Sequence, residues 1–125
     1  MTEAGLDVRL TQGFRTYSYQ NDLYDQGRTR RGHIVTDARG GESLHNFGLA
    51  YDVGVFDGGQ YVKRGADPRY RRVGVLGEGV ADGIGAARLR WGGRWSKPDS
   101  SHFEFDGGLP LTEIRRRFET GEPAF

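Results

Sequence analysis

Two short clusters of histidine and carboxylate residues form the part of this sequence that could do chemistry. The first, residues 43–52, holds His45 and, seven positions later, Asp52. The second, residues 99–104, is centred on His102. Two neutral imidazoles and one carboxylate are a common ligand set for a catalytic zinc ion, with the fourth position left to water. The pattern therefore predicts a fold that brings these two distant clusters together.

The composition agrees with a metal site built from histidine and carboxylate alone. The chain has 125 residues, enough for one modest core, and a formal net charge of +1, which does not require a polyanionic partner. Hydrophobic residues make up 35% and charged residues 28%, as in an ordinary globular protein. The absence of cysteine excludes disulfides, thiolate zinc ligands and cysteine nucleophiles.

Targeting signals are absent from the sequence as written. No apolar stretch approaches the roughly 20 residues needed to cross a bilayer, so we expect no membrane partner. The first residues lack the basic and apolar regions of a signal peptide. We therefore expect either that the protein is released by a separate export or lysis route and is cytoplasmic until then, or that a segment outside this sequence directs it.

Strands are predicted wherever apolar and polar residues alternate, because alternate side chains of a strand point to opposite faces. These stretches are 7–12, 49–56, 60–62, 88–91 and 101–105, and 33–35 could form a further short strand within a polar loop. In 49–56 the aliphatic residues share one face, so Asp52 projects from the other. His102 and Glu104 likewise share one face of their strand. The turn signal Asp57-Gly58-Gly59 predicts that 49–56 and 60–62 pair as a hairpin.

Three helices are predicted from capping residues and from apolar residues spaced three and four apart. The first runs from the Thr16 cap region to about Gln26 and ends at Gly27, and the last begins with Thr112 as its cap. The middle helix begins at Asp67-Pro68 and carries one apolar stripe, formed by Val73, Leu76, Val80, Ile84 and Ala87.

The middle helix also contains five glycines between 74 and 85, each of which costs about 1 kcal/mol against alanine. Such a helix either packs very closely against a neighbour or breaks around 77–79, and we expect two pieces with a bend. Helices and hairpin strands are mixed without regular alternation. We therefore predict an α+β fold, a small single domain with a mainly antiparallel sheet and flanking helices.

The first cluster reads Ser-x-His-x-x-Gly-x-Ala-x-Asp, and with this pattern the chain resembles the zinc peptidases that cleave peptidoglycan. That family includes D-Ala-D-Ala carboxypeptidases and dipeptidases, and the L-alanyl-D-glutamate endopeptidases of phage lysins and bacterial cell-wall hydrolases. Further segments that match the family are Gln12–Thr16 with Gln20 and Leu23-Tyr24, Trp91-Gly92-Gly93 with Trp95, and Asp99-x-x-His102-Phe103-Glu104. The resemblance covers roughly residues 8–106. It implies a Hedgehog/DD-peptidase-like fold, with residues 1–125 forming one zinc peptidase catalytic domain.

The resemblance also implies which residues hold the metal and the substrate. His45, Asp52 and His102 would bind one Zn²⁺ per chain, whose water would have its pKa lowered towards 7. Arg15 would stabilise the oxyanion that forms on the scissile carbonyl. Ser43 would brace the loop of His45 or hydrogen-bond the substrate. The aromatic residues Tyr17, Trp91 and Trp95 would either line a groove for the stem peptide or belong to the core.

Two carboxylates compete for the role of general base. The resemblance favours Asp99, which would take a proton from the water and later return one to the leaving amine. Glu104 shares the face of His102 on an extended strand, whereas Asp99 reaches the site only if the chain turns at Ser100-Ser101. If Asp99 is the base, Glu104 accepts an N–H of a ligand imidazole and fixes its tautomer.

We expect a monomeric zinc metallopeptidase that hydrolyses peptidoglycan stem peptides, at the bond between L-alanine and D-glutamate. One alternative is a D-alanyl-D-alanine carboxypeptidase of the same family, and another is a non-catalytic cell-wall-binding module on the same fold. A metal-dependent nuclease is disfavoured by the charge of +1 and by the lack of a concentrated basic segment, so we expect no nucleic-acid partner.

Overall fold

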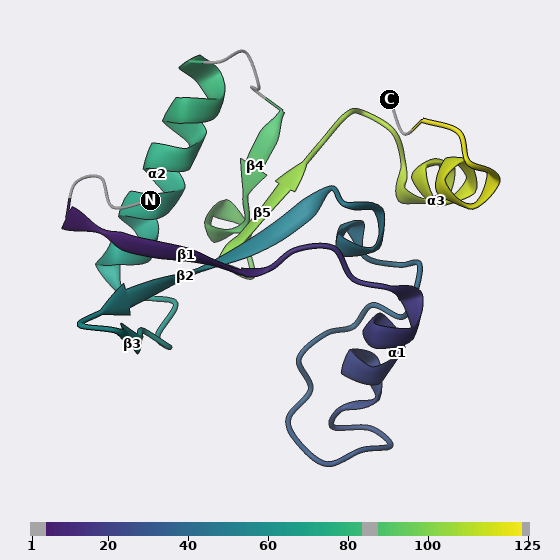
Figure 1. The fold of residues 1–125 in the computed structure, drawn as a ribbon, viewed down its shortest axis with the longest axis horizontal. Coiled ribbons are helices and arrows are strands. Elements are labelled where there is room, and N and C mark those ends of the chain that lie inside the picture. Colours follow the sequence, from purple (N-terminus) through teal and green to yellow (C-terminus); the bar gives the residue numbers. More distant parts are fainter. Residues whose placement is uncertain (1–4, 84–87, 124–125) are drawn as a thin grey trace. The chain divides into compact units, whose positions relative to one another are not determined.

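The structure, a computed structural model, describes residues 5–83 and 88–123 and contains three α-helices among five strands (Figure 1). The chain forms two compact units. The first, which we call the sheet unit, consists of Met1–Gly13 and Ala50–Asp106, and the second, the helical unit, consists of Phe14–Leu49 and Gly107–Phe125. No helix in the described ranges has both the length and the apolar character needed to span a membrane.

The sheet unit contains one antiparallel five-stranded sheet. Its strands are β1 (Asp7–Gln12), β2 (Ala50–Asp57), β3 (Gln60–Tyr61), β4 (Leu89–Trp91) and β5 (His102–Phe105). The strand order is β1-β2-β5-β4, and β3 pairs with β2 as a hairpin. Gly58 and Gly59 both have positive φ, 57° and 83°, which is the backbone that a tight hairpin turn demands. The five strands predicted for this unit, the hairpin and the antiparallel α+β class are confirmed, and only the boundaries differ by a residue or two.

Helix α2 (Pro68–Gly83) covers the sheet and completes its core. The buried cluster joins residues of the helix to residues of four strands and to Leu6, which precedes β1. Its members are Leu6, Val8, Val53, Val55, Tyr70, Val73, Trp91 and Phe103. Tyr70 also fixes the hairpin, because its hydroxyl donates to the carbonyl of Val62 at 2.8 Å and accepts from the amide of Val55 at 3.2 Å. The helix is thus tied to the sheet by both apolar packing and hydrogen bonds.

The predicted break in this helix is wrong, because α2 is a single helix over Pro68–Gly83. Its glycines serve close packing instead. A Cβ on Gly74 would lie 2.2 Å from the ring of Trp91, and one on Gly77 would lie 2.8 Å from the ring of Phe103. Large aromatic rings therefore occupy the space that side chains at these two positions would need.

The predicted apolar stripe of the helix is confirmed only in part. Val73 is buried and Leu76 is partly buried against the core, but Val80 is 53% exposed. Ala81 takes the inward position instead and is 4% exposed. Ile84 and Ala87 lie outside the described residues.

The helical unit contains α1 (Tyr17–Asp25), the 3-10 turn η2 (Leu44–Phe47) and α3 (Leu111–Thr120). The predicted start of α1 is confirmed: the Thr16 hydroxyl accepts from the amide of Tyr19 at 3.1 Å. The rings of Tyr17, Phe47 and Phe118 pack together with centroids 5.2–6.1 Å apart, so the three segments share one aromatic cluster. Tyr17 therefore belongs to the packing of this unit.

Two predictions for this unit are wrong. Residues 33–35 do not form a strand, and Ile34 and Val35 are 58% and 56% exposed. The cap of α3 is Pro110, not Thr112, which lies inside the helix. Proline supplies the extended backbone that precedes a first helical turn, so the helix starts one residue after it.

The glycines of α2 allow a matched test of this packing. Gly74→Ala is expected to lower the free energy of unfolding by about 1–3 kcal/mol, because the new methyl group overlaps the buried Trp91 ring. Gly79→Ala on the same helix has no atom within 4 Å of the new Cβ and is expected to raise it by up to about 1 kcal/mol. Urea unfolding followed by fluorescence measures both, and equal effects of the two substitutions would contradict the packing.

Candidate metal centre and active site

His102 lies between two carboxylates on neighbouring positions of the sheet. It is directly opposite Asp52 in the β2–β5 register and two residues before Glu104 on its own strand. Its Nδ1 is 3.1 Å from Oδ1 of Asp52, and its Nε2 is 2.9 Å from Oε1 of Glu104. The side chain of His102 is 11% exposed. Both ring nitrogens of a nearly buried imidazole are therefore matched by an anionic oxygen.

This arrangement shifts the pKa of His102. Burial of the ring lowers it, but hydrogen bonds to Asp52 and Glu104, with the charges of Asp52 and Asp99, raise the pKa of His102 to about 9. At neutral pH the metal-free imidazole is therefore protonated and shared by two carboxylates. A divalent cation can replace the proton on Nδ1, because imidazole nitrogen and carboxylate oxygen are its ordinary ligands.

The segment between Trp91 and His102 folds into a tight turn that carries Asp99. The carbonyl of Gly92 accepts from the amide of Asp99 at 3.0 Å, and the amide of His102 donates to the carbonyl of Asp99 at 3.2 Å. A Cβ on Gly92 would lie 2.6 Å from the Asp99 carbonyl oxygen, so glycine is needed for this closure. The turn at residues 99–101 that Asp99 requires is therefore present.

The two tryptophans of this segment have different surroundings. Trp91 is 5% exposed and belongs to the core, and its indole N–H donates to the carbonyl of Ser100 at 2.8 Å. Trp95 is 40% exposed, and its ring lies 5.2 Å from the His102 ring. The core interpretation thus holds for Trp91, while Trp95 flanks the candidate ligand.

In the helical unit, His45 lies in η2 and is held by its neighbours. Ser43 caps the turn, and its hydroxyl accepts from the amide of His45 at 3.2 Å. The His45 carbonyl accepts from the amide of Arg15 at 2.9 Å. Ser43 thus braces the His45 segment, and a backbone hydrogen bond connects Arg15 to His45.

Two buried amide side chains hold this part of the helical unit together. Asn46 is 0% exposed, accepts from the amides of Gly41 and Ser43, and donates to the carbonyl of Arg15 at 3.0 Å. Gln20 is also 0% exposed, donates to the carbonyl of Ala38 at 2.9 Å and accepts from the Arg15 guanidinium at 3.3 Å. Neither residue has a role that was predicted from the sequence.

A signal for one of them exists in the sequence. Ser43 followed three residues later by Asn46 is close to the capping-box pattern, in which both ends of the motif bond reciprocally, and such a box is present here. No comparable local signal marks Gln20, because its partner Ala38 lies eighteen residues away.

The predicted site residues fall into two groups. Asp52, Asp99, His102 and Glu104 gather in the sheet unit around one imidazole. Arg15 and His45 lie in the helical unit, where the backbone amide of Arg15 donates a hydrogen bond to the carbonyl of His45. Only seven positions of chain separate His45 from Asp52, so the two groups are joined by a short covalent link.

Comparison with protein families gives two matches that carry the same description, D-alanyl-D-alanine carboxypeptidase. One family model matches residues 36–105, which hold both histidine clusters, and the other matches residues 1–67. The chain belongs to this family. The predicted resemblance to peptidoglycan peptidases is thereby confirmed.

A curated relative is also a peptidoglycan peptidase. A stretch of 48 residues is 62% identical to the peptidoglycan L-alanyl-D-glutamate endopeptidase CwlK of Bacillus subtilis (strain 168). That match covers 38% of this chain and 29% of the length of the relative, so the chain spans less than a third of that protein by this measure.

Solved structures show the same fold. The crystal structure of the Serratia marcescens L-Ala D-Glu endopeptidase ChiX matches with a TM-score of 0.62 and 22% identity, over 81% of this chain and 68% of that one. The LD-carboxypeptidase LdcB matches with a TM-score of 0.50 and 23% identity, over 98% and 67%. The predicted DD-peptidase-like fold is therefore confirmed.

The pKa of His102, measured in the chelator-treated protein, tests whether its ring lies between Asp52 and Glu104. Its folded value, about 9, lies above the ordinary 6.5, so folding favours the charged ring. This contribution is fully present below about pH 6.5 and is lost as the pH rises through about 9. NMR of the imidazole C–H signals should show a titration near pH 9, and Asp52→Asn should move it to lower pH. A titration of His102 near pH 6.5 would contradict the geometry.

Proposed function

We propose that the chain is the catalytic domain of a zinc peptidase that hydrolyses peptidoglycan stem peptides at the L-alanyl-D-glutamate bond. The observation that supports this most is the placement of His102 between Asp52 and Glu104 inside the sheet unit. A histidine with one nitrogen beside a carboxylate ligand and the other fixed by a second carboxylate is a usual zinc-ligand arrangement. The 62% identity to an L-alanyl-D-glutamate endopeptidase over 48 residues supports the choice of bond.

The proposed metal ligands are His45, Asp52 and His102, holding one Zn²⁺ per chain. Each offers a ligand atom that zinc accepts, and the sum of one carboxylate and two neutral imidazoles leaves the ion with a net positive charge. Asp52 Oδ1 and His102 Nδ1 are the atoms of the sheet unit that already face one another. Bound there, zinc would supply Lewis acidity and a water of lowered pKa.

Asp99 is the proposed general base. Glu104 is engaged by the Nε2 of His102 at 2.9 Å, so its carboxylate serves to orient that ring. Asp99 is carried by the turn next to His102, and its charge acts on that imidazole. As the amide C–N bond breaks, Asp99 would deliver to the departing amine the proton that it took from the attacking water.

Arg15 is proposed to stabilise the oxyanion of the tetrahedral intermediate. Its backbone amide donates a hydrogen bond to the carbonyl of His45, and its guanidinium donates one to the side chain of the buried Gln20. A guanidinium held by a fully buried amide loses little freedom when it binds a developing negative charge. Under this proposal the two units act together as one catalytic domain over residues 1–125, as a monomer.

A second candidate is a D-alanyl-D-alanine carboxypeptidase, the activity for which both matching families are named. A non-catalytic wall-binding module on the same fold would keep the ligands but release no product. In each case the site of action would be the cell wall, reached by export or lysis.

Mass spectrometry of fragments released from purified sacculi tests the function and the bond. We expect new amino termini on D-glutamate, and loss of all release when a chelator is present, with recovery on adding Zn²⁺. Release of free D-alanine would support the carboxypeptidase instead. Binding to sacculi without any released fragment would contradict both enzymatic assignments.

Three substitutions separate metal ligation from proton transfer. Asp99→Asn is expected to keep about one zinc per chain and to lose about a thousandfold in activity, because it cannot accept a proton. His102→Ala is expected to lose both metal and activity, while Glu104→Gln keeps an acceptor for the His102 ring and retains part of each. Elemental analysis and hydrolysis rates measure them, and a metallated but inactive Glu104→Gln beside an active Asp99→Asn would reverse the assignment.

A further inference from the structure

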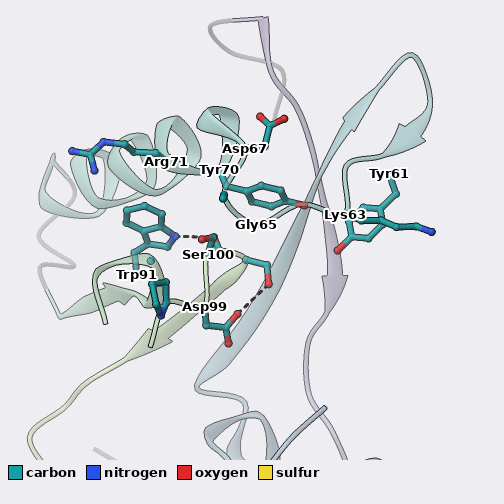
Figure 2. A pocket seen from close by; sticks show the side chains of 13 residues that line it. Tyr61, Lys63, Gly65, Asp67, Tyr70, Arg71, Trp91, Asp99 and Ser100 are labelled. Carbon is teal, nitrogen blue, oxygen red and sulfur yellow. Dashed lines mark hydrogen bonds between the residues drawn. The ribbon is translucent and has the colours of Figure 1, made fainter. Parts of the chain in front are cut away.

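A groove of about 560 Å³ lies in the sheet unit directly beside Asp99 (Figure 2). Its walls come from four segments: the end of the β2–β3 hairpin with the strap that follows it, the start of α2, the end of β4 at Trp91 with Gly93, and the turn over residues 98–101. The groove is therefore built entirely from residues whose mutual positions the sheet unit fixes.

We propose that this groove binds the residue on the amine side of the cleaved bond and selects for a carboxylate on that residue. The inference rests on the proposed function, since it takes Asp99 as the group that protonates the leaving amine. It assigns Tyr61, Lys63 and Arg71 as determinants of specificity.

The position of Asp99 decides which side of the substrate the groove receives. Hydrolysis breaks the amide C–N bond, the water oxygen stays on the carbonyl carbon, and the amine leaves with a proton from Asp99. Proton transfer requires the amine nitrogen within about 3 Å of that carboxylate. The residue that carries the amine must therefore occupy the space next to Asp99, and the groove is such a space.

Tyr61 gives the groove a hydrogen-bonding group. Its ring lies directly over Gly54, since a Cβ there would be 2.9 Å from its Cε1, and it packs against Phe56 at 5.6 Å. In Figure 2 the Tyr61 hydroxyl points into the groove, on the side of the Tyr70 ring and the Asp99 turn. Gly54 is two residues from Asp52 on β2, so this hydroxyl lies on the face of the strand that carries the proposed ligand.

The charges of the lining favour an anionic ligand. Asp67 is neutralised by Arg69, whose Nε and NH2 each lie 3.0 Å from one of its carboxylate oxygens. Lys63 and Arg71 flank the groove at opposite ends, and within residues 5–83 and 88–123 neither has a carboxylate partner. Two uncompensated cations against Asp99 make the potential along the groove positive and attract a carboxylate.

A pair of peptide substrates tests this selection. Both present L-alanine before the cleaved bond, and they differ only in whether the following residue carries a free carboxylate or a carboxamide. We expect the wild-type protein to cleave the carboxylate form about fivefold better in kcat/KM, a ratio in the range that two exposed cations supply. Lys63→Gln with Arg71→Gln should bring the ratio to about 1, chiefly by lowering kcat/KM for the carboxylate form.

Two single substitutions serve as controls: one removes a charge outside the groove, and the other removes an uncharged group inside it. Arg9→Gln removes the same charge from β1, outside the groove, and should leave the ratio at its wild-type value. Tyr61→Phe removes only the hydroxyl and should lower kcat/KM for both substrates about fivefold without changing their ratio. A ratio that survives the double substitution, or a Tyr61→Phe variant with wild-type rates, would overturn the inference.

Binding of the amine-side product separates this inference from the proposed function. NMR titration with the product peptide should show tighter binding of the carboxylate form than of the carboxamide form, and the double variant should lose that difference. Equal binding of both forms by the wild-type protein overturns the groove assignment even if the peptides are cleaved. Tighter binding of the carboxylate form without any cleavage of the peptides would support the groove assignment and contradict the peptidase assignment.

Discussion

One buried imidazole between two carboxylates is the constraint on which the candidate site depends. His102 is nearly buried, so a protonated ring needs both Asp52 and Glu104 to offset its loss of hydration. The antiparallel register supplies both at once, because Asp52 is the cross-strand partner of His102 and Glu104 is its neighbour on the same face. A register shift of one residue would turn His102 to the other face of the sheet and remove both contacts.

The packing of α2 against the sheet gives this register its rigidity. Gly74 and Gly77 let the rings of Trp91 and Phe103 approach the helix backbone, and Phe103 follows His102 directly on β5. Trp91 in turn binds the carbonyl of Ser100, so the core residue also anchors the turn that carries Asp99. The proposed base and the proposed ligand are thus held by the same buried cluster, which limits how far either can move independently.

The division into two compact units explains how the functional residues are distributed. The sheet unit carries the carboxylates and one imidazole, and its groove offers the positive rim that we propose for the substrate carboxylate. The helical unit carries the other imidazole and Arg15. The buried amides of Asn46 and Gln20 hydrogen-bond to Arg15, whose own amide donates to the carbonyl of His45. Family membership links these groups to peptide chemistry, because the matched segments include both histidine clusters.

Local sequence determined the elements and the facing of the key side chains. Alternation placed Asp52, His102 and Glu104 on strands, Gly58-Gly59 fixed the hairpin, and Thr16 fixed the start of α1, because each of these depends only on neighbouring residues. Long-range contacts decided the rest. The glycines of α2 predict a break when viewed locally, and only the rings of Trp91 and Phe103, distant in sequence, make an unbroken helix the stable choice. The exposure of Val80, the role of Gln20 and the pairing of His102 with Asp52, fifty residues away, were likewise tertiary outcomes, since no local pattern encodes which surfaces will meet.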